Sequence, residues 1–236
     1  MDCGHGSFGR SFRPYGEALS QIPEAEAAKL TGGLIRTGND YPEMQLRLFD
    51  MAEYFWQHPN SPFRNEELFI PVLEAITGAP HIDDINKIRP QALLASANKN
   101  RPGMKAADIC YTTGTGGRGT LHGIRADYLL LMGCPECDRI KEHILHSEVI
   151  NPLLVSGRLK MLAIYPDEDV STWREYLPQM PKGWTVGHSP MKHGETTAYD
   201  IPAIPALYLL EHDKTVLFKD SPIADIETWL RENINI

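Results

Sequence analysis

The sequence predicts a fold in two parts, an all-α helical domain followed by an α/β domain with a mixed sheet. From about Tyr15 to Asn98 the apolar residues recur at helical spacing, and strand signals are scarce. A polar stretch from Asn98 to Met104 interrupts this pattern. Beyond it, short apolar or alternating runs are separated by helical patterns, which is typical of an α/β domain. We therefore expect residues 1–100 to form the helical domain and residues 101–236 to form the α/β domain.

The first part of the chain is predicted to consist of amphipathic helices. One helix presents an apolar face made of Leu46, Phe49, Ala52, Phe55 and Trp56. The next begins after Asn65, a residue type favoured at helix N-caps, and ends at Gly78 and Pro80. A further helix is indicated by Ile85, Ile88, Leu93 and Leu94. We expect these apolar stripes to pack into a core, and we assign no chemistry to this domain.

The second part is predicted to alternate between strands and helices. The predicted elements are strands at 108–113, 118–122 and 127–132, a helix at 135–149, a strand at 159–165, a helix at 170–177, strands at 184–188, 206–211 and 215–219, and a helix at 222–232. The last two strands are separated by a short turn, so we expect them to form a hairpin. In the helix at 135–149, Ile140, Ile144 and Val149 should face the sheet. On the same helix, Lys141, Glu142 and His146 should face solvent.

Composition and charge exclude several classes of function. The net charge is -8 and no Lys/Arg run is present, which argues against nucleic acid as a partner. No apolar segment reaches the length of a membrane span. The chain begins without the apolar core of a signal peptide. With 4 cysteines the chain is no disulfide-rich scaffold, and the cysteine count alone does not define the redox compartment.

A CxxC motif, Cys134 to Cys137, lies where an apolar run gives way to a helical pattern. If Cys134 sits at the N-terminus of that helix, both sulfurs face the same side of the first turn. Pro135 suits the first helical position, where a missing N–H costs nothing. The positive end of the helix dipole would lower the pKa of Cys134 and make it the attacking nucleophile. Cys137 would then resolve the mixed disulfide.

Two other interpretations of this spacing stay open. The first is a structural disulfide, although a loop of about four residues contributes only roughly 2 kcal/mol of chain entropy, against about 3 for fifteen residues. The second is half of a zinc site. The nearest histidines in sequence, His143 and His146, lie too far along the same helix to share a metal easily with the two sulfurs. Cys3 and Cys110 form no second CxxC pair.

Other motifs carry no chemistry in this interpretation. The segment from Gly114 to Gly119 satisfies GxGxxG and follows a strand, but no helix follows it to receive a phosphate, so we expect a loop between two strands. The histidine pairs His143 with His146 and His188 with His193 lack suitably spaced carboxylates, and we expect surface positions. The sequence has no GxSxG and no HExxH motif.

Residues 103–109, 134–137 and 201–210 are three segments that point to one family. Together they resemble thioredoxin-fold proteins, most closely the TlpA/ResA-type branch of thiol-disulfide oxidoreductases. In that family the first segment opens the domain, CxxC caps the first long helix, and an Ile-Pro-Thr-like segment carries a cis-proline that faces the disulfide. The resemblance implies that Pro205 is this cis-proline, with Ala206 in place of threonine. It also implies that Ile204 and Pro205 contact the backbone of a substrate polypeptide.

The whole chain is similar to Bacteroidetes cell-envelope proteins in which a helical domain of unknown function precedes a thioredoxin-like domain. Residues 60–68 and 165–169 carry this similarity. It implies an exported protein, periplasmic or lipid-anchored, whose targeting segment is absent from this chain. The chain departs from thioredoxins before the motif, because Leu131-Met132-Gly133 replaces the usual Trp-Ala-x-Trp approach. A Glu136 charge close to Cys134 would also oppose thiolate formation.

The resulting hypothesis is a thiol-disulfide oxidoreductase that exchanges its redox-active disulfide with protein thiols and an unidentified redox partner. Cys134 is the nucleophile, Cys137 the resolving cysteine, and Ile204 with Pro205 the substrate-binding pair. We expect neither an organic cofactor nor a metal. The main alternative is a noncatalytic thioredoxin-fold binding module of the cell envelope. A thiol peroxidase is a weaker alternative, because the residues ahead of Cys134 do not match the Pro-x-x-x-Thr/Ser-x-x-Cys pattern of peroxiredoxins.

Overall fold

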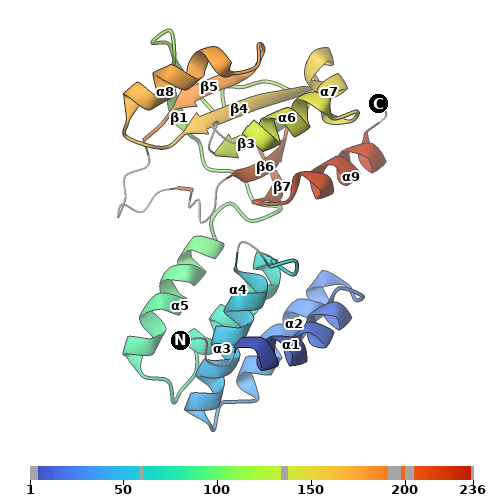
Figure 1. The fold of residues 1–236 in the computed structure, drawn as a ribbon. Helices are drawn as coiled ribbons and strands as arrows, with labels where there is room; N and C mark the ends of the chain where they lie inside the picture. The colour runs from blue at the N-terminus through green and yellow to red at the C-terminus, as the bar shows by residue number, and fades with distance from the viewer. Residues whose placement is uncertain (1–4, 59–60, 134–137, 191–197, 200–204, 235–236) are drawn as a thin grey trace. The chain divides into compact units, whose positions relative to one another are not determined.

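The computed structural model describes residues 5–58, 61–133, 138–190, 198–199 and 205–234. The chain divides into two compact units, Met1–Asn98 and Lys99–Ile236. Figure 1 shows helices α1 to α5 in the first unit and a sheet with flanking helices in the second. This arrangement confirms the predicted fold class, a helical region followed by a mixed sheet flanked by helices.

The first unit is organised around one apolar helix. Its helices are α1 (His5–Leu19), α2 (Glu24–Arg36), α3 (Pro42–Trp56), α4 (Glu66–Thr77) and α5 (Asp84–Ala97). Helix α4 packs against α2, α3 and α5, and most of its residues are buried. As predicted, Asn65 is its N-cap, since the side-chain Oδ1 accepts a hydrogen bond from Leu68 N at 3.1 Å. A helix that is apolar on nearly every side must lie at the centre of its unit.

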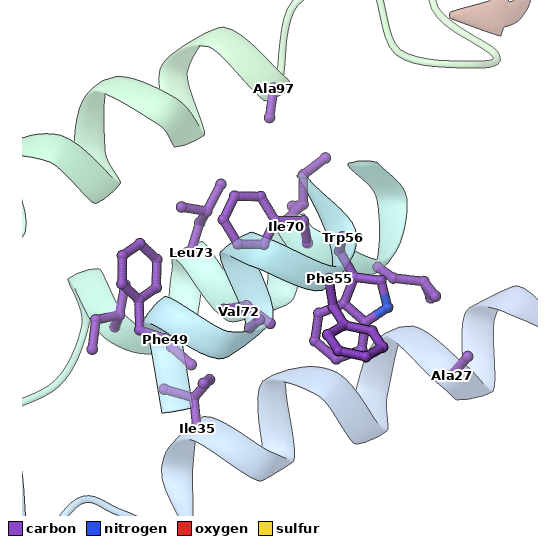
Figure 2. Packing of buried hydrophobic residues seen from close by; sticks show 14 of the residues in the cluster. Ala27, Ile35, Phe49, Phe55, Trp56, Ile70, Val72, Leu73 and Ala97 are labelled. Carbon is purple, nitrogen blue, oxygen red and sulfur yellow. The ribbon is translucent and has the colours of Figure 1, made fainter. Parts of the chain in front are cut away.

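The core of this unit combines aromatic and aliphatic side chains. Figure 2 shows side chains of α2, α3 and α4 gathered in it, among them Ile35, Phe49 and Leu73. Phe49 stacks on Phe69 with ring centroids 6.1 Å apart. Thr31 is fully buried, and its hydroxyl lies 2.8 Å from the Leu68 carbonyl oxygen, so this polar group at the α2/α4 contact is paired.

Helix α5 differs from the prediction. Ile85 and Ile88 were expected in the core, but they are 72% and 59% exposed. With 3.6 residues per turn, they lie on the opposite side of the helix from Pro90 and Ala97, which are buried. The apolar stripe predicted for α5 is therefore too long, because its four residues do not lie on one face of the helix. The α5 core contact consists of its second half, where Leu93 is partly buried.

Within the described residues, the second unit contains a seven-stranded sheet of order β2-β1-β5-β4-β3-β6-β7. Its strands are β1 (Cys110–Thr113), β2 (Arg118–Thr120), β3 (Tyr128–Gly133), β4 (Leu159–Tyr165), β5 (Thr185–His188), β6 (Ala206–Glu211) and β7 (Val216–Lys219). Strands β3, β4 and β5 are parallel, whereas β6 and β1 run antiparallel to their neighbours in the centre. The hairpin predicted for β6 and β7 is confirmed.

Both faces of the central strands are buried. The flanking helices are α6 (Asp138–His146), α7 (Ile150–Ser156), α8 (Val170–Tyr176) and α9 (Ile223–Asn233), and η1 (Leu177–Gln179) follows α8. Leu130 belongs to the apolar cluster that contains side chains of α6, α7 and α9, whereas Leu129 and Leu131 belong to the cluster on the other face. Successive side chains of a strand point to opposite faces of the sheet. Because both faces are buried here, the sequence of β3 is a continuous apolar run.

The helix predicted at 135–149 ends earlier in the structure, and a second helix that follows it was not predicted. α6 ends at His146, and α7 begins at Ile150 and ends before Gly157, which has a left-handed φ of 78°. The Ser147 hydroxyl accepts hydrogen bonds from the Val149 and Ile150 amides, so it satisfies donors at the start of α7. Sequence signals for this second helix existed in Ser147, in Pro152 of the first turn and in Gly157.

The solvent face predicted for α6 is wrong at one residue. Glu142 and His146 are exposed as expected, and Ile144 is fully buried. Lys141, however, is only 9% exposed, and its ammonium pairs with the Asp138 carboxylate one turn earlier. A lysine can bury its aliphatic stem and keep its charged end paired, so polarity alone did not reveal its position.

The contact between α2 and α4 can be tested at two adjacent glycines. A Cβ on Gly32 would lie 3.0 Å from both Cβ and O of Pro71, whereas a Cβ on Gly33 would meet nothing within 4 Å. We expect Gly32→Ala to lower the free energy of unfolding by about 1 kcal/mol or more through overpacking. Gly33→Ala should raise it by up to about 1 kcal/mol, because alanine favours the helix. Urea denaturation followed by circular dichroism measures both, and equal effects of the two variants would contradict the packing.

Candidate thiol-disulfide site

The pairing of β3 with β6 aligns the residues that flank two segments predicted from the sequence to form the site. Gly133, the last residue of β3, is the register partner of Ala206, the first residue of β6. Cys134 follows Gly133 directly in the chain, and Pro205 directly precedes Ala206. Cys134, Cys137 and Ile204 lie outside the described residues. Pro205 is described, and it is half-buried in a bend before β6.

Three parallel strands end at the edge of the sheet that carries this pair. Gly133 of β3 is aligned with Ile164 of β4, and Ile164 with Gly187 of β5. The next aligned pair is Tyr165 with His188. The carboxyl ends of parallel strands are the usual position of ligand and active sites in α/β sheets. Gly133, the residue that precedes Cys134 in the sequence, lies at this edge of the sheet.

An aromatic cluster lies at the same edge. The His188 ring stacks on Trp173 of α8, with centroids 5.1 Å apart and 27° between planes, and lies 6.2 Å from the Tyr165 ring. His188 Nε2 is 2.7 Å from the Asp167 carbonyl oxygen. These contacts give His188 a packing role and leave it half-buried, whereas His143 and His146 are exposed, as predicted. Across the described ranges, no group of three or more His, Cys, Asp or Glu side chains is arranged to hold a metal.

The loop after β4 is held by a strong helix cap. Asp169 is the N-cap of α8, and its carboxylate accepts hydrogen bonds from the hydroxyls and backbone amides of Ser171 and Thr172. Because these bonds favour the charged form, they lower the pKa of Asp169 to about 2. The cap fixes the start of α8 and thereby the position of Trp173, which stacks on His188.

Two residues near the segment that leads to Pro205 were missed by the sequence analysis. Asn100 and Tyr199 are buried, and each makes a side-chain hydrogen bond to the backbone of Ala107. Asn100 also bonds the carbonyl of Ala198. The bonds of Asn100 to Ala198 and of Tyr199 to Ala107 join residues 98 and 92 positions apart, so no local pattern could reveal them. The only signal was the presence of an asparagine and a tyrosine next to segments of the family pattern.

The GxGxxG segment is a hairpin connection, as expected. It joins β1 to β2, which pair in antiparallel register from Cys110 with Thr120 onward. Gly116 takes a φ of 83°, and the Thr113 amide donates to the Gly117 carbonyl at 2.8 Å, which closes the turn. Cys110 is exposed on β1 and has a free thiol.

Comparison with known proteins identifies the family. The model of a domain of unknown function, DUF5106, matches residues 13–100. A thioredoxin-like protein from Bacteroides caccae is 36% identical, with 98% of this chain and 86% of that chain covered and a TM-score of 0.91. The C-terminal domain of an uncharacterized protein from Bacteroides fragilis is 38% identical over 56% of this chain and 98% of that chain, with a TM-score of 0.52.

A conserved protein of unknown function from Bacteroides fragilis is 33% identical over 55% of this chain and 98% of that chain, with a TM-score of 0.51. No curated protein matches the chain. The mixed sheet and its order define a thioredoxin-like fold. The chain belongs to the thioredoxin-like proteins, with a DUF5106 region before its thioredoxin-like unit. In the part of the chain that the structure describes, no helix is long and apolar enough to cross a membrane.

The Asp169 cap predicts a specific pH dependence. The pKa of this group is below its ordinary value of 3.8, so its stabilisation is complete above that value and is lost as the pH falls toward about 2. Asp169→Asn removes the charge at every pH. We therefore expect the difference in unfolding free energy between wild type and Asp169→Asn to shrink between these two pH values. Urea denaturation at stepped pH measures it.

Glu168→Gln is the matched control, because Glu168 is an exposed carboxylate on the same loop. Its substitution changes the net charge equally without touching the cap. The cap assignment would be contradicted if the difference in unfolding free energy between wild type and Asp169→Asn did not change with pH. It would also be contradicted if the difference between wild type and Glu168→Gln changed with pH to the same extent.

Proposed function

We propose that the protein is a thiol-disulfide oxidoreductase that exchanges its CxxC dithiol or disulfide with protein substrates of the cell envelope. The observation that carries the proposal is the register of β3 and β6. It pairs the residue before Cys134 with the residue after Pro205. A CxxC motif and a substrate-contacting proline must lie side by side to act together, and this register supports such a pairing. The family membership supports it independently.

In the proposed reduction, the Cys134 thiolate attacks a sulfur of the substrate disulfide. The Cys134–substrate S–S bond forms, the substrate S–S bond breaks, and the departing sulfur takes a proton. Cys137 then loses its proton and attacks the Cys134 sulfur. The Cys134–Cys137 disulfide forms and the second substrate thiol is released, so two electrons have passed from the protein to the substrate. An external dithiol protein reduces Cys134–Cys137 again for the next cycle.

The reverse direction oxidises substrate dithiols by the same bonds in the opposite order. Its electron acceptor is then an oxidised disulfide partner protein. The direction follows from the reduction potential of the Cys134/Cys137 couple relative to its partners, since 30 mV corresponds to about 1.4 kcal/mol for two electrons. No metal or organic cofactor takes part in this scheme.

Helix α6 supplies the electrostatics in this proposal. A thiolate on Cys134 before the helix gains from the unpaired amides and the positive dipole end, which lower its pKa. Glu136 between the cysteines opposes this effect. Beyond the motif, Asp138 carries a negative charge in the first described turn, but the Lys141 ammonium neutralises it. The pair leaves the helix dipole and Glu136 as opposing influences on the thiolate.

Ile204 and Pro205 are proposed to contact the backbone of the substrate next to its disulfide. A proline cannot donate a hydrogen bond into the sheet, and in this proposal the backbone of Ile204 before it forms strand-like pairing with another polypeptide. The half-buried position of Pro205, immediately before the fully buried β6 residue Ala206, supports a fixed contact point. By the same proposal the protein acts in the periplasm or on the cell envelope.

A disulfide-reduction assay tests the proposal. With a protein disulfide substrate and a dithiol reductant, wild type should accelerate reduction, and Cys134→Ser should return the rate to the uncatalysed background. Cys137→Ser keeps the nucleophile but not the resolving thiol, so it should accumulate a mixed disulfide with the substrate, which non-reducing electrophoresis and mass measurement detect.

Cys110→Ser is the matched control, because Cys110 is an exposed free thiol elsewhere in the sheet. It should leave the rate unchanged. Equal rates for wild type and Cys134→Ser under several redox partners would overturn the enzymatic proposal and favour a noncatalytic binding module. Rapid alkylation of Cys134 ahead of Cys137 is expected for the enzyme and not for that module.

A further inference from the structure

Asn100 joins two segments of the second unit that are distant in sequence. Its amide nitrogen donates to the Ala198 carbonyl oxygen at 2.8 Å, and its Oδ1 accepts from the Ala107 amide at 2.8 Å. The residue is 6% exposed and has a positive φ of 49°. Asparagine adopts this left-handed conformation more readily than most residues, so both its backbone and its side chain suit this position.

Tyr199 makes the adjoining contact. Its hydroxyl donates to the Ala107 carbonyl oxygen at 2.7 Å, and its ring packs edge-on against Tyr208 of β6 with centroids 5.6 Å apart. The side chain is 3% exposed. Burial raises the pKa of the Tyr199 hydroxyl, and the nearby Asp108 charge raises it further, so the group stays a neutral donor. Ala107 thus has both its N–H and its C=O paired with these two side chains.

These contacts lie close in sequence to Pro205. Tyr199 precedes Pro205 by six residues, and Ala206 after it begins β6. Tyr208, against which Tyr199 packs, is the register partner of Leu131 in the same ladder that pairs Gly133 with Ala206. The chain is therefore held on both sides of Pro205, by the hydrogen bonds at 198–199 and by the sheet from Ala206 onward. Tyr199 therefore contacts, through Tyr208, the strand whose first residue follows Pro205.

We infer that Asn100, Ala107 and Tyr199 form a clamp that positions Pro205 for contact with the substrate backbone. This inference rests on the proposed function, because it assigns the clamp a part in substrate binding at that site. Asn100 and Tyr199 are positioning residues, since they act through Pro205 and do not touch the reacting sulfurs. The clamp affects how the substrate is held and leaves the exchange chemistry of Cys134 and Cys137 unaltered.

The experiment removes the Tyr199 hydroxyl and measures substrate binding separately from chemistry. Tyr199→Phe keeps the ring that packs on Tyr208 and loses the hydrogen bond to Ala107. We expect KM for a protein disulfide substrate to rise about fivefold, the equilibrium change that one lost hydrogen bond produces. The kcat and the reduction potential of Cys134/Cys137 should stay unchanged. Hydrogen exchange of peptides that contain residues 198–207 should accelerate by a similar factor.

Tyr128→Phe is the matched control. Tyr128 lies at the opposite end of β3 from Cys134, and its ring packs on Trp229. Its substitution should change neither KM nor the exchange of those peptides. An active wild type with unchanged KM and unchanged exchange in Tyr199→Phe overturns the clamp and leaves the proposed function intact. An inactive wild type overturns the proposed function itself, and the role of the clamp with it.

A second variant tests the other half of the clamp. Asn100→Asp keeps the preference for a positive φ and the acceptor for the Ala107 amide, but it loses the donor to Ala198. It should raise KM in the same direction as Tyr199→Phe. If the two residues act as one unit, the double variant should raise KM by less than the product of the two single effects. If KM of the double variant rose by the full product of the two single effects, the two residues would act independently, and the clamp as one unit would be overturned.

Discussion

The antiparallel pairing of β3 with β6 is the constraint on which the rest of the second unit depends. Leu130 faces Leu209 and Leu131 faces Tyr208 in this ladder, and all four side chains are buried. A slip of one residue would turn every side chain of a strand to the opposite face, so two filled apolar clusters hold the register in place. The same register sets Gly133 opposite Ala206. The geometry of the candidate site is in this sense a consequence of core packing.

The segment that opens the second unit connects this core to its surroundings. The amides of Gly103 and Ala106 donate to the carbonyls of Val216 and Lys214, and the Val216 amide donates to Met104, all within 2.8 to 2.9 Å. The segment therefore lies along the β6–β7 turn before it reaches Ala107 and the clamp. It pairs with this turn and with Val216, the first residue of β7, although it belongs to no strand.

Sequence periodicity predicted the strands and the fold class well, because alternation and apolar runs report directly on which faces are buried. Sequence periodicity failed where burial depends on the angular position of a residue on its helix, or on a contact with a residue distant in sequence. Ile85 and Ile88 had the right composition for a core but the wrong angular position on α5. Lys141 is buried through its stem and a local ion pair. Asn100 and Tyr199 bond Ala198 and Ala107, which lie 98 and 92 positions away in the sequence. A proximity of the Cys134 and Pro205 segments was suggested only by family resemblance.

The electrostatics near the motif bear on how the proposed dithiol would be tuned. The reduction potential depends on how much more a charge stabilises the thiolate form than the disulfide form, and 30 mV corresponds to about 1.4 kcal/mol. Asp138 taken alone would raise the thiolate pKa, but its pairing with Lys141 makes the two nearly neutral at a distance. A lysine held at 9% exposure also keeps that neutralisation in place, because it has little freedom to leave. In the proposed site, the charge of Glu136, which lies between the two cysteines in the sequence, opposes the helix dipole.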